Sequence, residues 1–293
     1  MLSLVLLIAA LIAGLAAAAI SWRVGRRATP AGGHTARPAA EAIAHRPAAR
    51  SRLARRLDPE VATGLALSLA LVLIVGGGLV LAVLAHLVRG DTHLVRIDRS
   101  VAEWGDRHAT PFSSDVLDAV TTLGEPTIVA LLAVLVAVVE TVRTRSRWVV
   151  PFLLVVVAGN GILTTTVKHL ADRVRPDVNP IAETLGPSFP SGHSSWSIAF
   201  FAATALLMSR GRDRTARAVI AGAAAALTVM VAGSRVLLGV HWLSDVLAGL
   251  ALGAAWFAVC AIAFGGRLLR FGAPAEEAVR ASAPRPTLAR RAP

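Results

Sequence analysis

The sequence predicts an all-α, polytopic integral membrane protein, and three observations support this prediction. Apolar residues make up 55% of the 293 residues and charged residues only 16%, a balance that is untypical of soluble domains. Several uncharged stretches approach or exceed the roughly 20 residues that a helix needs to cross a bilayer. Basic residues gather between alternate stretches, as expected when successive loops lie on opposite sides of a membrane.

Seven apolar stretches are expected to form transmembrane helices. They lie at about 1–21, 61–88, 126–142, 148–167, 193–209, 217–233 and 243–264. The first, 1–21, is an additional N-terminal helix, and the other six form a core over residues 61–264. Residues 22–60, rich in Arg, Ala and Pro, are expected to be a basic cytoplasmic linker, and residues 265–293 a basic, disordered cytoplasmic tail.

The first stretch has a second interpretation, as a cleaved signal peptide, because Ala16 to Ala19 resemble a small-residue cleavage region. No positively charged region precedes the apolar run, however. Cleavage would also leave nine arginines on the outer face. We therefore expect an uncleaved helix with its N-terminus outside.

The distribution of charge predicts which side of the membrane each loop faces. Arginines cluster at 23–56, 143–147, 210–217 and 267–291, which places 22 basic and 7 acidic residues on one side. The opposite side has 8 basic and 11 acidic residues. The positive-inside rule assigns the arginine-rich side to the cytoplasm. Because the net charge of +12 is spread over loops, we do not expect a nucleic-acid partner.

The connection over residues 90–125 belongs to the outer side. Within it, Leu94, Ile97, Val101 and Trp104 recur at spacings of three and four, which predicts an amphipathic helix on the membrane surface. Such a helix would either help to admit a lipid or simply cover the core. The single cysteine, Cys260, lies in the last apolar stretch and is expected to be a packed thiol.

Three polar blocks fall on the outer side, and the first joins Lys168, the only lysine, to Arg175 and Pro176. Seven residues are two helical turns, so the two cations share a face if the helix continues to its outer end. Pro176 is expected to end the helix at about Arg175. Two stacked cations favour an anion between them. Taken alone, this block is more typical of a basic helix end in which Asp172 neutralises Lys168.

The second block, Pro190 to His193, precedes an apolar helix. Ser191 is a candidate N-cap, Gly192 lets the backbone come close to a ligand, and nearby N–H groups would face a bound anion. His193 would lie at the mouth of that site, able to donate a proton to a leaving oxygen. A plain helix cap followed by an interfacial histidine is the alternative.

The third block contains Arg235 at the outer end of one helix and His241 at the start of the next, with a turn at Gly239. His241 and Asp245 are four residues apart and so lie on one face. A carboxylate there can fix one imidazole nitrogen and leave the other as a nucleophile. An acid at the edge of an apolar helix is costly without such a partner. The alternative is a purely structural His–Asp pair.

The three blocks together resemble the signature K-x6-R-P, P-S-G-H and S-R-x5-H-x3-D of the type 2 phosphatidic acid phosphatase and vanadium haloperoxidase superfamily, in its membrane-bound lipid phosphatase branch. All three parts are complete, in order and correctly spaced over residues 168–245. The resemblance extends over about residues 61–264 and implies a six-helix phosphatase core.

The resemblance also implies which residues bind the phosphate. Lys168, Arg175 and Arg235 would hold its oxygens, with Ser191 and the Gly192 amide completing the site. No metal or other cofactor is implied, because fixed cations and helix N–H groups stabilise the transition state.

The same resemblance implies a phosphohistidine mechanism. His241 would attack phosphorus, Asp245 would orient His241, and His193 would protonate the leaving group and then activate water. The implied substrate is a lipid phosphate in the membrane, such as undecaprenyl pyrophosphate, phosphatidate or phosphatidylglycerol phosphate. A lipid phosphotransferase, a vanadium-dependent haloperoxidase and a non-enzymatic membrane scaffold or transporter are the alternatives. The sequence does not indicate an oligomeric state.

Overall fold

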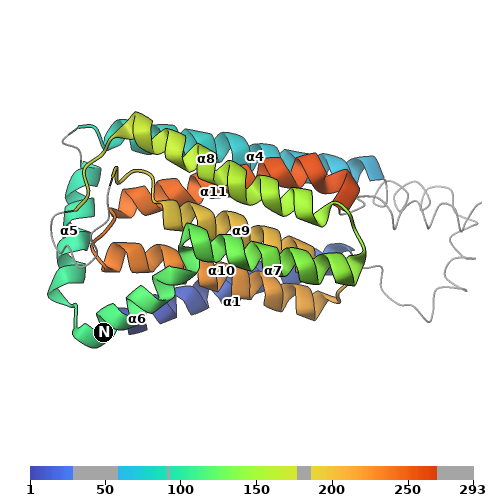
Figure 1. The fold of residues 1–293 in the computed structure, drawn as a ribbon, viewed down its shortest axis with the longest axis horizontal. Helices are drawn as coiled ribbons and strands as arrows, with labels where there is room; N and C mark the ends of the chain where they lie inside the picture. Colours follow the sequence, from blue (N-terminus) through green and yellow to red (C-terminus); the bar gives the residue numbers. More distant parts are fainter. Residues whose placement is uncertain (29–58, 91–92, 177–185, 269–293) are drawn as a thin grey trace, which may run out of the picture.

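The computed structural model describes residues 1–28, 59–90, 93–176 and 186–268 (Figure 1). Throughout these ranges the regular structure is helical, which confirms the predicted all-α class. Most of the predicted linker and tail lie outside the described residues. The helices are α1 (Leu2–Ala28), α4 (Pro59–Leu87), α5 (His93–Arg107), α6 (Pro111–Thr121), a short 3₁₀ turn η1 (Thr122–Gly124), α7 (Pro126–Thr144), α8 (Val149–Ala171), α9 (Gly192–Met208), α10 (Arg214–Leu237) and α11 (Leu243–Leu268).

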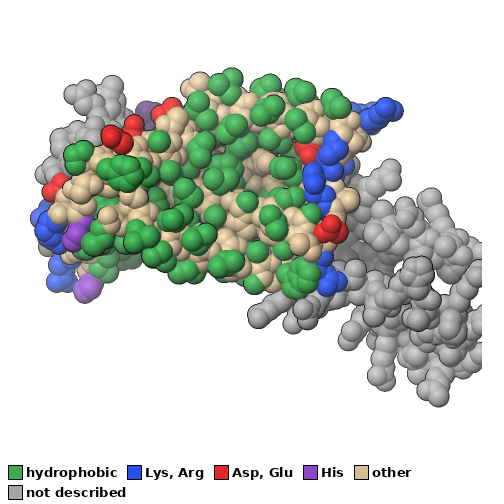
Figure 2. Space-filling view, turned by 90° about the horizontal axis from the view of Figure 1, so that it is seen from below, with side chains coloured by type: hydrophobic (Ala, Val, Ile, Leu, Met, Phe, Trp, Pro, Cys, Tyr) green, Lys and Arg blue, Asp and Glu red, His purple; other side chains and the backbone are tan. Residues whose placement is uncertain are grey.

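Seven long helices lie side by side along the long axis of the molecule (Figure 1). All of them except α9 are long and apolar enough to cross a membrane. Large apolar side chains such as Leu15, Leu131 and Val142 are exposed on their outer faces. Figure 2 shows apolar side chains over the middle of one face and charged side chains at its two ends. An apolar belt between charged ends is what a bilayer requires, and the protein is a multi-pass membrane protein.

Helix α9 is the shortest of the seven, with 17 residues. It is surrounded by α7, α8, α10 and α11, and it buries Phe200, Phe201 and Ala203. A helix enclosed by its neighbours contacts little lipid, so its length is set by packing rather than by the bilayer. Its first turn lies at the end of the bundle that carries the three polar blocks.

Two glycines of α11 allow close contact with α9. A Cβ atom built on Gly249 would overlap the carbonyl oxygen of Ser191, and one built on Gly253 would overlap that of Ser195. Small residues of this kind let the backbones of membrane helices approach one another. The approach also brings the start of α11 next to the start of α9, where the backbone N–H of Ser191 donates to the Asp245 carbonyl oxygen at 2.9 Å.

Replacing Gly253 by valine is therefore expected to lower the free energy of unfolding by about 1–3 kcal/mol, because the new side chain forces the α9 and α11 backbones apart. Thermal unfolding in detergent micelles measures this. Gly78→Val on α4 is the matched control, because a Cβ there meets nothing within 4 Å. Equal unfolding midpoints for the two variants would contradict the close contact.

Helix α1 was predicted to lie outside the six-helix core, and in the structure it packs along α10. A Cβ on Gly14 would come within 2.9 Å of the Gly222 carbonyl oxygen, and a Cβ on Gly222 within 2.8 Å of the Gly14 carbonyl oxygen. At the site end, Leu2 and Leu6 share an apolar cluster with Leu238 and Val240. The N-terminal helix thus supports the turn that precedes His241.

Helices α5 and α6 lie at this same end of the bundle, with α5 crossing it (Figure 1). The predicted amphipathic helix is confirmed as α5. Helix α6 was not predicted. Its first turn contains Pro111, and a capping box joins Thr110 to Ser113. The backbone N–H of each of these two residues donates to the side-chain hydroxyl oxygen of the other.

Candidate active site

The two cations of the first block converge, although no helix joins them. Lys168 lies in the last turn of α8, which ends at Ala171, earlier than Pro176 led us to predict. Asp172 follows in the left-handed region with φ of 43°, a common way to end a helix. The predicted shared helical face is therefore wrong. The side chains instead meet at the Pro187 carbonyl oxygen, 2.6 Å from Lys168 Nζ and 3.5 Å from Arg175 Nη2.

The second block forms the start of α9. Ser191 occupies the N-cap position as predicted, but its hydroxyl makes no capping hydrogen bond. It accepts a hydrogen bond from Ser194 Oγ at 3.0 Å and is fully buried. Gly192 and His193 line a cavity, and a Cβ on Gly192 would come within 3.9 Å of Lys168 Cε. A side chain at position 192 would therefore point toward the cations.

The third block is a tight turn between α10 and α11. Gly239 adopts a φ of 67°, in the region that favours glycine, and the backbone N–H of His241 donates to the Arg235 carbonyl oxygen at 3.2 Å. His241 precedes α11 and Asp245 lies in its first turn. The predicted pairing is present: His241 Nδ1 lies 3.4 Å from Asp245 Oδ2, and both residues are buried.

The two ring nitrogens of His241 have different neighbours. Arg175 Nη1 lies 3.2 Å from Nε2, and because a guanidinium can only donate, Nε2 is the acceptor and Nδ1 carries the hydrogen. Burial lowers the pKa of His241 from 6.5 to about 4, more than the neighbouring Asp245 carboxylate raises it. His241 is thus a neutral imidazole near pH 7, and its unprotonated nitrogen is Nε2, which accepts from Arg175. Burial also lowers the pKa of Arg175.

A cavity of about 500 Å³ is lined by six of the eight residues that the sequence analysis selected. It brings together residues from α7, α8, α9 and α10 and from the loops that follow α8 and α10. Ser191 and Asp245 do not line it and are fully buried. The lining residues are Pro126, Thr164, Thr165, Lys168, Arg175, Pro187, Gly192, His193, Trp196, Arg235 and His241.

Arg235 is the most deeply buried cation of this cavity, with 4% of its surface exposed. Its Nη1 donates to Thr121 Oγ1 at 3.0 Å, and its Nε has no hydrogen-bond partner among the described residues. Buried guanidinium donors that lack a protein acceptor are costly and favour an anionic ligand. Three cations around His241 and His193 make the cavity suited to a phosphate group.

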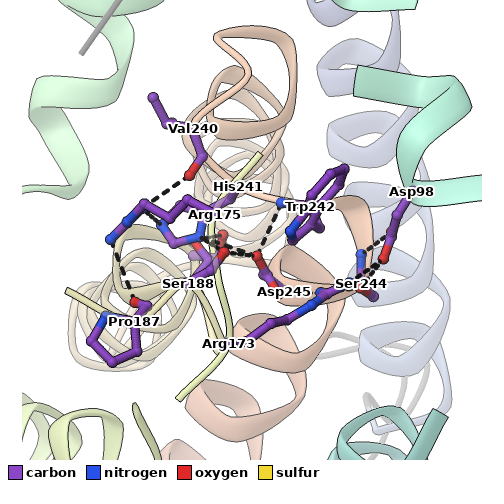
Figure 3. Close-up of polar contacts among 12 residues, drawn as sticks. Asp98, Arg173, Arg175, Pro187, Ser188, Val240, His241, Trp242, Ser244 and Asp245 are labelled. Carbon is purple, nitrogen blue, oxygen red and sulfur yellow. Dashed lines mark hydrogen bonds and ion pairs between the residues drawn. The ribbon is translucent and has the colours of Figure 1, made fainter. Parts of the chain in front are cut away.

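Ser188 and Arg173 contact the His241–Asp245 pair, and Asp98 contacts Arg173; none of the three was selected from the sequence as a site residue (Figure 3). Ser188 Oγ donates to Asp245 Oδ2. Arg173 Nη1 donates to Asp245 Oδ1 at 2.6 Å, and Arg173 Nη2 donates to Asp98 Oδ2 at 2.9 Å. Asp98 had a usable signal, because it is an acidic residue on the apolar face that Leu94 and Val101 define. Arg173 had a weaker one, because it stands beside the first block without belonging to its pattern.

Comparison with known proteins identifies the family. The sequence model described as the PAP2 superfamily matches residues 148–268, which include every predicted site residue. Decaprenylphosphoryl-5-phosphoribose phosphatase of Mycobacterium tuberculosis is 35% identical over 153 residues, which cover 49% of this chain and 76% of that protein. The chain belongs to the PAP2 superfamily. The resemblance read from the three blocks is thereby confirmed.

Two further relatives and one solved structure are similar to the chain. Phosphatidylglycerophosphatase B of Bacillus subtilis is 30% identical, covering 49% of this chain and 71% of that protein. Lipid A 1-phosphatase of Rhizobium johnstonii is 36% identical, covering 41% of this chain and 51% of that protein. The crystal structure of the transmembrane PAP2-type phosphatidylglycerolphosphate phosphatase from Bacillus subtilis aligns with a TM-score of 0.61 and 27% identity. That alignment covers 68% of this chain and 99% of the other.

Proposed function

We propose that this protein is a metal-independent lipid phosphatase that hydrolyses a phosphomonoester or pyrophosphate of a membrane lipid through a phosphohistidine on His241. One observation carries the proposal: His241, whose Nε2 accepts a hydrogen bond from Arg175, lines a cavity together with Lys168, Arg175 and Arg235. A dianionic phosphate would be attracted to these cations, and its phosphorus would lie next to the lone pair. A divalent metal ion would be repelled by the same three charges.

In the first step, the Nε2 lone pair of His241 forms a bond to phosphorus, and the bond from phosphorus to the leaving oxygen breaks. His193 acts as the general acid and donates a proton to that oxygen. Asp245 accepts the Nδ1 hydrogen bond of His241 and stabilises the positive charge that develops on the ring.

In the second step, neutral His193 takes a proton from water as the water oxygen attacks phosphorus. The phosphorus–nitrogen bond breaks, inorganic phosphate leaves, and both histidines return to their starting protonation states. The cations of the cavity serve both steps, because charge on the phosphoryl oxygens is similar in each.

Two features support a lipid as the substrate. The cavity lies at one end of a bundle of membrane helices. Its lining includes the apolar side chain of Trp196 and the exposed residue Thr165. The matched relatives are named for phosphatidylglycerophosphate, lipid A and a decaprenyl phosphate sugar, all of which carry a phosphate on a lipid. The residues of the cavity would bind only the phosphate group. The helices around the cavity would therefore select which lipid is hydrolysed.

The positive-inside rule supports an active site on the extracytoplasmic face, because the arginine-rich loops that the structure describes, 143–147 and 210–217, lie at the opposite end of the bundle (Figure 1). Cysteine labelling in intact cells measures this. Ser100→Cys on the exposed face of α5 is expected to react with a membrane-impermeant maleimide, and Arg147→Cys, exposed between α7 and α8, is expected to react only after lysis. The reverse pattern would place the site in the cytoplasm.

The pH dependence of kcat/KM follows from His241. Its pKa is lowered to about 4, so the neutral nucleophile persists as the pH falls through 6.5 and is lost only near pH 4. The acidic limb due to His241 should therefore lie near pH 4. Comparing two lipid substrates whose phosphate pKa values differ separates this limb from the ionisation of the substrate. A substrate-independent acidic limb near pH 6.5 would contradict the assignment.

The function is tested by measuring phosphate release by detergent-purified protein in EDTA. Undecaprenyl pyrophosphate, phosphatidate and phosphatidylglycerol phosphate are offered separately, with His241→Ala as the control. We expect wild-type protein to release phosphate from at least one lipid and the variant to release none. Activity that returns only with an added divalent metal would overturn metal independence. Phosphate transferred to an added alcohol with no free phosphate would indicate a phosphotransferase.

A further inference from the structure

A buried chain of charged groups links the surface helix α5 to the Asp245 carboxylate (Figure 3). Asp98 of α5 and Asp245 of α11 both accept hydrogen bonds from Arg173, at 2.9 and 2.6 Å. Ser244 completes the link, because its backbone N–H donates to Asp98 Oδ1 at 2.9 Å and its hydroxyl donates to Asp98 Oδ2. Arg173 also donates to Ser244 Oγ at 2.8 Å.

This arrangement is unusual for a surface helix. Asp98 is 1% exposed and Asp245 is fully buried, while the Arg173 side chain is 12% exposed. Buried carboxylates are costly without a partner, and Arg173 pairs with two of them at once. The guanidinium also lies 5.4 Å from the Trp242 ring, which fixes its plane. Such a cluster is too well ordered to be an incidental surface ion pair.

Arg173 does not line the phosphate cavity, whose cations are Lys168, Arg175 and Arg235. It contacts Asp245 through Oδ1, whereas Oδ2 is the oxygen nearest to His241 Nδ1, at 3.4 Å. The two carboxylate oxygens thus have separate partners. Fixing Oδ1 sets the direction in which Oδ2 faces the imidazole.

We propose that Arg173, held in place by Asp98 of α5, is a positioning residue for the reaction, which orients the Asp245 carboxylate toward His241 and separates it from the second buried carboxylate. This inference rests on the proposed function of His241. Without Arg173, Asp98 and Asp245 would face each other with no cation between them, and only the Ser188 hydroxyl and the Trp242 backbone N–H would still hold Oδ2 toward the ring. The planar fork of arginine suits this role, because its two nitrogens reach two carboxylates that a single lysine ammonium cannot bridge.

The test uses full-length protein in detergent with the lipid that wild type hydrolyses fastest. For Arg173→Gln we expect kcat to fall about 100-fold with KM changed less than about 3-fold, because the phosphate-binding cations remain. For Asp98→Asn and for Arg173→Lys we expect losses in kcat of about 10-fold. The double variant Arg173→Gln/Asp98→Asn should be about 10-fold faster than Arg173→Gln, because it removes the repelling carboxylate.

The matched control is the exposed ion pair of the same helix, Glu103 with Arg107, where Arg107→Gln should retain wild-type kcat. If the role were purely structural, the kcat losses of Arg173→Gln and Asp98→Asn would multiply in the double variant. That result would overturn the proposal. An unchanged kcat in Arg173→Gln would do the same. If Arg173→Gln does not fold, a wild-type kcat in Arg173→Lys or Asp98→Asn would also refute it. Inactive wild-type protein would count against the proposed function and not against Arg173 alone.

Discussion

His241→Ala protein is expected to lose about 10⁴-fold in kcat relative to wild type, the largest effect of any substitution. The loss follows from the position of Nε2, whose lone pair lies 3.2 Å from Arg175 Nη1 on a residue that lines the cavity. Alanine leaves the phosphate-binding groups in place, so binding of inorganic phosphate should weaken far less than turnover. Phosphate release and phosphate affinity, measured on the same preparation, test both statements.

His169→Ala is the control for this prediction. His169 directly follows Lys168 in α8, is exposed, and does not line the cavity. Its removal should leave kcat within about 2-fold of wild type. Comparable losses in the two variants would mean that the assay reports damage to α8 or to the bundle, and a small loss in His241→Ala would remove the nucleophile from the mechanism.

Arg235→Gln is expected to lower kcat/KM by about 10³-fold, the second largest effect. The guanidinium is buried beside His193 and His241, and its Nε lacks an acceptor among the residues that the structure describes. A charge in such a site is screened little by solvent, so its attraction for a developing phosphoryl charge is strong. Kinetics at saturating and subsaturating lipid separate the effect on binding from that on the transition state.

The matched control for Arg235→Gln is Arg217→Gln. Arg217 belongs to the same helix, α10, but is exposed at the end opposite to Arg235. This variant should keep kcat/KM within about 2-fold of wild type. If Arg235→Gln and Arg217→Gln behaved alike, the position of the charge would be irrelevant, and the cavity would not be the phosphate site.

The sequence predicted the seven long helices because each is encoded locally, by an apolar run long enough for a membrane. It also predicted which polar residues converge, since the order of the spans places Lys168, His193 and His241 at one end of the bundle. The resemblance of three spaced blocks supplied the roles. These parts of the fold and site depend on short-range patterns, which is why they were accessible without a structure.

The parts that were missed depend on contacts distant in sequence or on local backbone geometry. The contact between Asp98 and Arg173 joins residues 75 positions apart, and nothing around either residue indicates its partner. The end of α8 is set by the left-handed conformation of Asp172, and Pro176 only marks where the helix could no longer continue. Ser191 has the residue type of an N-cap, but its hydroxyl bonds to Ser194 instead.

The most direct test of the central claim is to look for phosphate covalently bound to His241. His193→Ala protein would be mixed with a lipid diphosphate, whose leaving phosphate needs little protonation, so the phosphoenzyme should form but lose its phosphate slowly. After quenching in alkali, which preserves phosphohistidine, mass spectrometry would locate the modification. The account predicts an acid-labile phosphate on His241 that is absent from His193→Ala/His241→Ala protein. Phosphate on another residue, or turnover by wild type with no phosphoenzyme in either protein, would contradict it.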